Sequence, residues 1–416
     1  MNMIALKQLG SFKNGLNFGA EAITEIGYDI IGIPDFGDNY VAPNHNLKKV
    51  NSEIVLSDYL LAEDDILFVR SNGNKALVGR TMIVKDIENP TTFSGFCIRY
   101  RPDSKKVFPL YMLYLFKSPI FRRFFANNQQ TSITNLNQDV LSSILIDLPS
   151  LEKQKAIANT IHCITRQIEN NNLINDNLAQ QVNALYDYWF TQFDFPDENN
   201  KPYRSSGGQM VWNDKLKMNI PISFNSIPLR ELLSFQSGYS FSSDEYVVNG
   251  KYSLITIKNV QDDGINLHID NYIQDIPEKM PHYCLLKQKD ILMSLTGNTG
   301  RVGLMFTNNC LLNQRVAVVV LNNQVLHAYT YCLLKNNLVR KKLEAIAGGS
   351  SQANLSPIDA ANIQIAFNEK MAIAFSKKIQ PAIDIIVNNL RENLYLHQIR
   401  DFLLPLLMNG QATIAE

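Results

Sequence analysis

Few residue groupings in this sequence have the types and spacing that catalysis requires. A nuclease of the PD…(D/E)xK kind needs paired carboxylates and a lysine, and Pro34-Asp35 with Asp103-Ser104-Lys105 fits that pattern only loosely. An adenine methyltransferase needs a cofactor-binding glycine motif and an Asn/Asp-Pro-Pro-Tyr/Phe motif, which Asn89-Pro90-Thr91-Thr92 does not match. Gly297-Asn298-Thr299-Gly300 lacks the Gly-Lys-Ser/Thr ending of a nucleotide-binding loop. We therefore expect no catalytic set and no metal or cofactor site.

The chain contains an internal repeat. The segment LKQLGSFKNGLNF (6–18) aligns with LRELLSFQSGYSF (229–241), and LLAEDDILFVRSNGN (60–74) aligns with LLKQKDILMSLTGNT (285–299). The matches keep the same order, and their offset drifts only from 223 to 225 and then to about 218. Short loop insertions produce such a drift, so we infer two homologous units.

A long amphipathic segment follows each unit. Apolar residues recur every three or four positions in 149–190, at Ile157, Ile161, Ile164, Ile168, Leu178, Val182, Leu185 and Trp189. Polar residues 169–177 interrupt this stripe without a Gly or Pro, so we expect one continuous helix. A helix this long needs a partner for its stripe, and the repeat supplies one in 369–410. We expect Pro381 to kink or delay that second helix and Gly410 to end it.

These patterns predict an α+β protein with two similar mixed α/β domains and two long antiparallel, coiled-coil-like helices related by a pseudo-twofold internal repeat. Strand-like runs, including 66–69 and 316–321, and helix-like runs at 108–125 and 327–347 recur in the two domains. The expected boundaries are a first domain at 1–148, a helix at 149–193, a linker at 194–222, a second domain at 223–368, and a helix with tail at 369–416.

The composition is that of a soluble globular protein. The 416 residues carry no formal net charge and are 45% hydrophobic, and no apolar run is long enough to span a membrane. The five cysteines lie far apart without a CxxC motif, which is typical of reduced thiols. We therefore expect a cytoplasmic protein that does not associate with membranes.

Three segments resemble the specificity subunits of type I restriction–modification systems. They are IDLPSLEKQKAIANTI (146–161), FDFPDENNKPYRSSGGQMVWNDKL (193–216) and the tail QIRDFLLPLLMNGQATI (398–414). The resemblance covers nearly the whole chain. It departs from the family where IAFNEKMAIAF (365–375) lacks the Pro and Gln of the first helix entry, and where the segment after Pro221 lacks a Gly-Trp.

The resemblance implies a non-catalytic protein with two target-recognition domains. Each domain would read one half of a bipartite double-stranded DNA site, and the two helices would set the distance between the halves. Two adenine-N6 methyltransferase (modification) subunits would dock on the chain, and restriction subunits would join them. S-adenosylmethionine, ATP and Mg²⁺ would be used by those partners, while this chain would hold no cofactor.

Four loop sets that recur in both units carry side chains suited to base edges and phosphates. The first, around a glycine expected to allow a tight turn, comprises Lys13 and Asn14, with Ser237 and Tyr239 opposite. The second comprises Arg70, Ser71, Asn72, Asn74 and Lys75, with Thr296, Asn298, Thr299 and Arg301 opposite. The third comprises Arg99 and Arg101, with Gln314 and Arg315 opposite. The fourth comprises Thr131, Ser132 and Thr134, with Ser350, Ser351 and Gln352 opposite.

Each loop set also has a purely structural interpretation, as a hairpin turn, a solvated strand edge or a helix cap. At the level of the whole chain, a self-contained nuclease with a duplicated DNA-binding architecture and an adaptor that binds only proteins are the two alternatives. Mg²⁺-dependent cleavage by the isolated chain would favour the nuclease, and a failure to bind DNA with its partner present would favour the adaptor.

Overall fold

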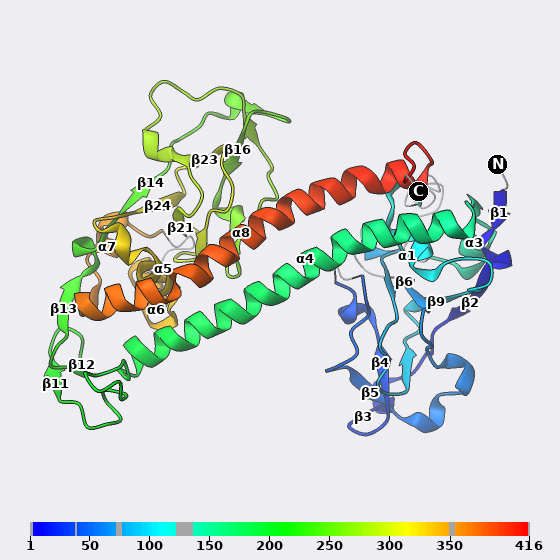
Figure 1. Cartoon of the computed structure of the whole chain (residues 1–416), viewed down its shortest axis with the longest axis horizontal. Helices are drawn as coiled ribbons and strands as arrows, with labels where there is room; N and C mark the ends of the chain where they lie inside the picture. The colour runs from blue at the N-terminus through cyan, green and yellow to red at the C-terminus, as the bar shows by residue number, and fades with distance from the viewer. Residues whose placement is uncertain (1–2, 38–39, 72–76, 122–135, 349–353, 415–416) are drawn as a thin grey trace. The chain divides into compact units, whose positions relative to one another are not determined.

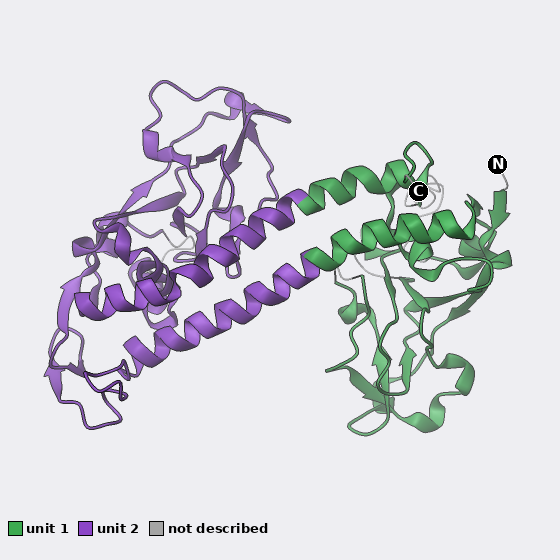
Figure 2. Ribbon diagram, viewed as in Figure 1, with its two compact units in different colours: residues 1–167, 396–416 green, residues 168–395 purple. Residues whose placement is uncertain are grey.

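The computed structural model describes residues 3–37, 40–71, 77–121, 136–348 and 354–414. The chain divides into two compact units, one of residues 1–167 and 396–416 and the other of residues 168–395 (Figure 2). Both units combine short strands with helices, and the predicted α+β class with two similar domains is confirmed.

The first unit is built on an antiparallel sheet with the order β2-β9-β6-β7. Its strands are β2 (Gly10–Asn14), β6 (Ile66–Val69), β7 (Thr81–Ile83) and β9 (Cys97–Pro102). A second sheet has the order β3-β5-β4-β8, and in it β4 and β8 run parallel. Its strands are β3 (Ile23–Thr24), β4 (Tyr28–Ile31), β5 (Lys48–Val50) and β8 (Thr91–Phe93). The pair β1 (Met3–Ala5) and β10 (Leu145–Asp147) and the helices α1 (Pro109–Lys117) and α3 (Gln138–Ser143) complete this unit before the long helix.

The second unit repeats this topology. Its main sheet has the order β14-β24-β21-β22, from β14 (Leu233–Ser237), β21 (Ile291–Ser294), β22 (Val302–Leu304) and β24 (Val316–Leu321). In its other sheet, β15-β19-β16-β23-β20, the strands β16 and β23 are again the parallel pair. Those strands are β15 (Tyr246–Val247), β16 (Tyr252–Ile255), β19 (Tyr272–Ile273), β20 (Leu285–Leu286) and β23 (Cys310–Leu312). Two further pairs are β13 (Asn225–Pro228) with β25 (Gln364–Phe367), and β17 (Val260–Gln261) with β18 (Gly264–Ile265).

The segment that we expected to be a linker is folded. It contains a hairpin of β11 (Met210–Asn213) and β12 (Met218–Pro221). The ring of Phe195 stacks on Tyr203 and Phe224, with ring centroids 4.8 and 5.2 Å apart. Aromatic packing thus orders a stretch whose Asn, Asp, Gly and Ser content is typical of a linker.

The structure contains the two long helices that the sequence predicts to pack on each other. Helix α4 (Leu151–Tyr186) ends in a π-helical turn over Asp187–Thr191, and helix α8 spans Glu369–Met408 (Figure 1). Pro381 does not delay this second helix, which begins at Glu369 and is continuous through that exposed residue, while the kink stays a prediction. Gly410 has φ +73°, the left-handed conformation expected just after a helix end.

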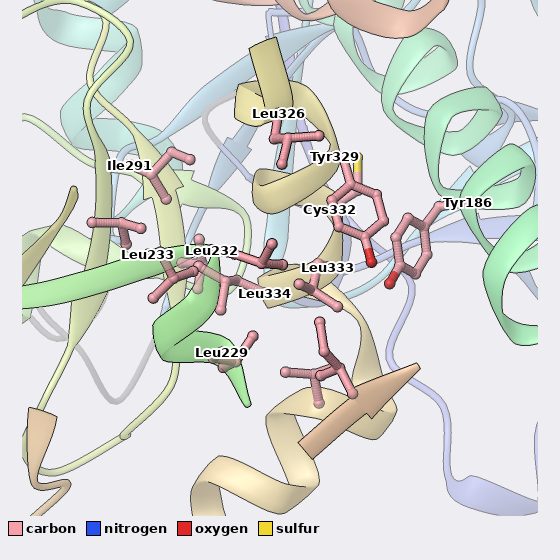
Figure 3. Packing of buried hydrophobic residues seen from close by; sticks show 14 of the residues in the cluster. Tyr186, Leu229, Leu232, Leu233, Ile291, Leu326, Tyr329, Cys332, Leu333 and Leu334 are labelled. Carbon is pink, nitrogen blue, oxygen red and sulfur yellow. The ribbon is translucent and has the colours of Figure 1, made fainter. Parts of the chain in front are cut away.

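The helix-like run 327–347 is two helices, α5 (His327–Lys335) and α6 (Asn337–Ile346). Asn336 causes the break, because its side chain accepts a hydrogen bond from the Leu338 amide at 2.9 Å and caps α6. In the other predicted helical run, 108–125, α1 is followed by a bend at Ser118 and by helical residues 119–121, and residues 122–125 lie outside the described residues. Tyr186 at the end of α4 lies against Tyr329 of α5, their ring centroids 6.1 Å apart (Figure 3). The short helix α7 (Pro357–Ala361) follows in the same unit.

Candidate nucleic-acid interface

In the second unit, the predicted loops meet at one edge of the sheet β14-β24-β21-β22. The register pairs Ser237 with Ala317 and Ser294 with Val316. The carboxyl ends of β14 and β21 and the amino end of β24 therefore lie side by side. The loops that leave these strand ends form what we call the second loop edge: residues 237–239, 295–301 and 313–315, with 354–355.

Backbone hydrogen bonds tie these loops together. The Tyr239 amide donates to the Leu312 carbonyl at 2.9 Å, and the Gln314 amide donates back to the Tyr239 carbonyl at 3.0 Å. The Leu295 amide donates to the Arg315 carbonyl at 3.0 Å, and the Leu355 amide donates to the Leu295 carbonyl at 2.7 Å. Because four segments share one hydrogen-bonded lattice, the edge holds its side chains on a fixed backbone.

The same four bonds recur in the first unit. The Leu16 amide donates to Phe93 at 2.9 Å, and Gly95 donates back to Leu16 at 2.7 Å. The Arg70 amide donates to Phe96 and the Leu136 amide to Arg70, both at 2.7 Å. Residues 14–16, 70–71, 79–80, 93–96 and 136 are therefore the first loop edge.

One glycine in each edge is required by close packing of the backbone. A Cβ atom on Gly15 would lie 2.0 Å from the Ser94 carbonyl oxygen, and one on Gly238 would lie 2.3 Å from the Leu312 carbonyl oxygen. Neither glycine has a positive φ, so the tight turn that we expected is not what requires them. They allow two chain segments to touch.

In the second unit, the structure brings together all the predicted residues that it describes. The side chains of Asn298, Gln314 and Arg315 are exposed, whereas Ser237, Tyr239, Thr296 and Arg301 are half-buried and Thr299 is buried. The carbonyl of Ser237 accepts a hydrogen bond from the Tyr283 hydroxyl at 3.1 Å. The buried hydroxyl of Thr296 has no hydrogen-bond partner within the described part of the chain, so its hydrogen-bonding capacity is unused at this edge.

Arg301 is held by a carboxylate. Its Nε and Nη2 atoms donate to the two oxygens of Asp262, at 3.1 and 2.7 Å, and Arg340 of α6 donates to the same carboxylate at 2.7 Å. Desolvation opposes ionisation, but the bonds from Arg340 and Arg301 prevail and lower the pKa of Asp262. Asp262 is therefore ionised at neutral pH and fixes the guanidinium of Arg301 in one orientation. These three side chains help to line a polar cleft of about 520 Å³ next to Gly300.

In the first unit, Asn14, Arg70 and Ser71 lie half-buried at the loop edge. Arg70 donates to the Gly95 carbonyl at 3.4 Å, and the side-chain oxygen of Asn14 is buried without a partner among the described residues. Lys13 instead turns to Asp58, with which it forms an ion pair, and its ammonium lies 4.1 Å from the centroid of the Tyr59 ring.

Arg99 and Arg101 of the third predicted set form hydrogen bonds within the first unit. Arg99 is 6% exposed and donates to the carbonyls of Asp58 and Leu60, at 2.9 and 3.1 Å. Arg101 donates to both oxygens of the buried Asp65, at 2.7 and 2.6 Å. Strand β9 buries Arg99 within the sheet, whereas the side chain of Arg101 is 40% exposed, and its contact with DNA stays a prediction.

The hydrogen-bond lattice also corrects the alignment of the repeats. Gly95 and Phe96 are the equivalents of Gln314 and Arg315, because they make the same backbone bonds. Arg80 is the equivalent of Arg301, since Val69 bonds to Arg80 as Ser294 bonds to Arg301, each at 2.9 Å. The loop between β6 and β7 is longer than its counterpart, which is why the second predicted loop set placed Lys75, and not Arg80, opposite the segment that contains Arg301.

Two residues of the first loop edge were therefore missed. Phe96 is 59% exposed, and the Arg80 guanidinium donates to the Gly37 carbonyl at 3.2 Å. The sequence did carry a signal for the equivalence of Arg80 and Arg301. Each follows a glycine, at 79–80 and at 300–301, and precedes an apolar strand. Both glycines have similar positive φ angles, +78° and +76°. The remaining predicted residues lie outside the described residues: Asn72, Asn74, Lys75, Thr131, Ser132, Thr134, Ser350, Ser351 and Gln352.

The described residues contain no cluster of three or more His, Cys, Asp or Glu placed to hold a metal ion. The acids of the nuclease alternative serve local structure. Asp35 accepts a hydrogen bond from the Gly32 amide at 2.7 Å, and Asp103 accepts one from the Lys105 amide at 3.1 Å and forms an ion pair with Lys106. No helix in the described ranges has the length and apolar character to cross a membrane.

Comparison with known proteins agrees with these features. The family model described as the type I restriction modification DNA specificity domain matches residues 1–180 and 221–394. The MjaIX specificity subunit of Methanocaldococcus jannaschii is 26% identical, over 82% of this chain and 77% of its own. The HindI specificity subunit of Haemophilus influenzae is 23% identical, over 80% of this chain and 84% of its own. The crystal structure of an S subunit from M. genitalium covers 98% of this chain and 95% of its own at 17% identity, with a TM-score of 0.62.

Proposed function

Because this chain belongs to the family of type I restriction–modification DNA specificity subunits, we propose that each of its two loop edges reads one half of a bipartite double-stranded DNA site. The protein is a non-catalytic component that recognises DNA sequence.

The repeated lattice of backbone bonds carries this proposal. The two loop edges share four backbone hydrogen bonds but carry different side chains at equivalent positions: Leu16 and Phe96 in the first edge, and Tyr239 and Arg315 in the second. A common backbone would hold the two edges against DNA in the same way, while the side chains would select different bases. We therefore expect the two half-sites to differ.

The two long helices would set the unread gap between the half-sites and carry two modification subunits. Those subunits would methylate adenine N6 with S-adenosylmethionine, and restriction subunits using ATP and Mg²⁺ would join the complex in the cytoplasm. This chain would recognise the DNA sequence and set the distance between the half-sites, and it would hold no cofactor itself.

Reconstitution tests the proposal. The chain, its modification subunit and S-adenosylmethionine are incubated with a DNA library, and methylated adenines are mapped at base resolution. We expect one bipartite motif with two different halves, and no methylation by either protein alone. A modification subunit that does not bind this chain, or methylation without a two-part motif, would contradict the proposal.

The nuclease alternative gives a different result. The purified chain alone would cleave DNA in the presence of Mg²⁺, and Asp103→Ala would abolish the cleavage. Its acids take part in local structure, so we expect no cleavage by either the native chain or the variant.

A further inference from the structure

A layer of asparagines lies in the seam between α4 and α8. In the second unit, the buried or half-buried seam positions of α4 follow one another every three or four residues, at Ile168, Asn171, Asn175, Leu178 and Val182. Asn171 and Asn175 are 3% and 8% exposed, and Asn393 of α8 is 6% exposed. Apolar residues are the usual occupants of such positions, so buried amides here need a reason.

The amides bond across the seam. Asn171 donates to the side-chain oxygen of Asn393 at 2.9 Å, and Asn389 donates to that of Asn175 at 2.9 Å. Asn393 in turn donates to Asn172 at 2.8 Å. The Nδ2 atom of Asn175 is buried without a partner in the described part of the chain. The layer therefore pays a desolvation cost that leucines would avoid, and stability alone does not explain it.

The layer is symmetric under the internal repeat. Asn389 and Asn393 lie 218 positions after Asn171 and Asn175, and Ile379 lies at the same offset after Ile161. Each asparagine thus bonds to the counterpart of its neighbour, as in a pair of antiparallel helices that cross at a local twofold axis. Both halves of the repeat supply the same two polar positions, and they match in only one register.

We infer that these four asparagines fix the register of α4 against α8 and are the positioning residues behind gap specificity. The second half of this inference rests on the proposed function. A shift of α8 by seven residues would place Ile386 opposite Asn171 and Ala382 opposite Asn175. The amides would then be buried without partners, so the shifted register is disfavoured, whereas an all-leucine seam would tolerate it.

Cross-linking tests the register on the chain alone. Leu178→Cys with Ile386→Cys reports the native register, and Leu178→Cys with Ile379→Cys reports a shift of seven residues, both with the exposed Cys163 changed to Ser. The test variant, called the four-leucine variant, combines Asn171→Leu, Asn175→Leu, Asn389→Leu and Asn393→Leu. The control is Asn388→Leu, an exposed position on α8.

We expect the ratio of shifted to native cross-link to rise by roughly tenfold or more in the four-leucine variant and to stay unchanged in the control. An unchanged ratio in the four-leucine variant overturns the inference. If that variant does not fold, Asn175→Leu with Asn389→Leu keeps the Asn171–Asn393 bond, and an intermediate rise is then expected; no rise counts against the inference.

A second measurement concerns the gap. Bipartite DNA substrates with gaps varied one base pair at a time are methylated by the reconstituted complex. We expect the four-leucine variant to accept gaps that the native chain rejects. A sharper preference would overturn the inference, because the layer would then be a flexible joint. Absence of any gap preference in the native complex would contradict the proposed function and leave the cross-linking result standing.

Discussion

Arg301 and Asp262 form a bidentate pair, with Nε and Nη2 of the arginine 3.1 and 2.7 Å from the two carboxylate oxygens. The arginine side chain is 23% exposed, so the pair is accessible at the loop edge. A guanidinium held on one side by a carboxylate loses little conformational freedom when its remaining N–H groups bond to a base or phosphate. The structurally equivalent arginine in the first unit is Arg80.

Replacing either arginine should weaken recognition of one half-site only. We expect Arg301→Ala to reduce binding to DNA that carries the full site by about 1–3 kcal/mol, and Arg80→Ala to do so through the other half. Gel shifts of the reconstituted complex on DNA with one or the other half-site altered would measure this. Arg166→Ala, an exposed position on α4, is the control and should have no effect on half-site preference. Equal losses of both half-sites from a single variant would contradict the assignment.

The repeat and the paired helices could be predicted because they leave periodic apolar positions in the sequence. Ile161, Ile168 and Val182 mark the seam of α4 directly. The asparagines between them could not be recognised as seam residues from the sequence. A buried amide is expected at such a position only if a hydrogen-bond partner lies opposite it, and that partner is known only from the structure. The burial of Arg99 could not be predicted for the same reason. An arginine in a strand is expected at the surface unless acceptors lie beside it, and here the carbonyls of Asp58 and Leu60 accept its hydrogen bonds. Arg80 was missed because a loop insertion shifted its alignment.

Two aspartates at the same place in the repeat should respond to substitution in opposite ways. Asp65 accepts hydrogen bonds from Arg101 and the Ala62 amide, whereas Asp290 accepts one from the Lys287 amide and has no arginine opposite it among the described residues. Burial raises the pKa of Asp290, and the Lys287 amide opposes this only in part. We expect Asp290→Asn to raise the melting temperature at pH 7 and Asp65→Asn to lower it, by about 1.5–3 kcal/mol of unfolding free energy for Asp65.

The effect of Asp290→Asn on stability should depend on pH, and the direction of this dependence follows from the raised pKa of Asp290. Its folded pKa lies above the unfolded value near 4, so its contribution to stability is fully present below that value and is lost as the pH rises through the folded pKa. Calorimetry from pH 4 to pH 8 should therefore show the advantage of Asp290→Asn growing as the pH rises. An advantage that is constant with pH would mean that ionisation of Asp290 is not its source.

The two close-approach glycines should not accept a side chain. Gly15→Ala or Gly238→Ala would place a Cβ atom within 2.3 Å of a carbonyl oxygen, so we expect a loss of about 1–3 kcal/mol in unfolding free energy and weaker recognition of the corresponding half-site. Gly32→Ala is the matched control, because its Cβ would meet nothing closer than 3.6 Å. Thermal melts and half-site gel shifts would measure both effects. Native-like behaviour of Gly238→Ala would show that the loop edge can open without cost.

Lengthening both helices together should lengthen the gap. Seven residues with the native apolar spacing are inserted after Asn177 in α4 and after Ile386 in α8, on the same side of the asparagine layer. A heptad adds about 10 Å of helix and keeps the seam facing its partner. At roughly 3.4 Å per base pair, we expect the preferred gap to grow by about three base pairs, measured by methylation of DNA with graded gaps. The same insertion in α4 alone is the control and should lower the melting temperature, because the two seams no longer match. An unchanged gap in the double insertion would mean that the helices do not set the distance between the half-sites.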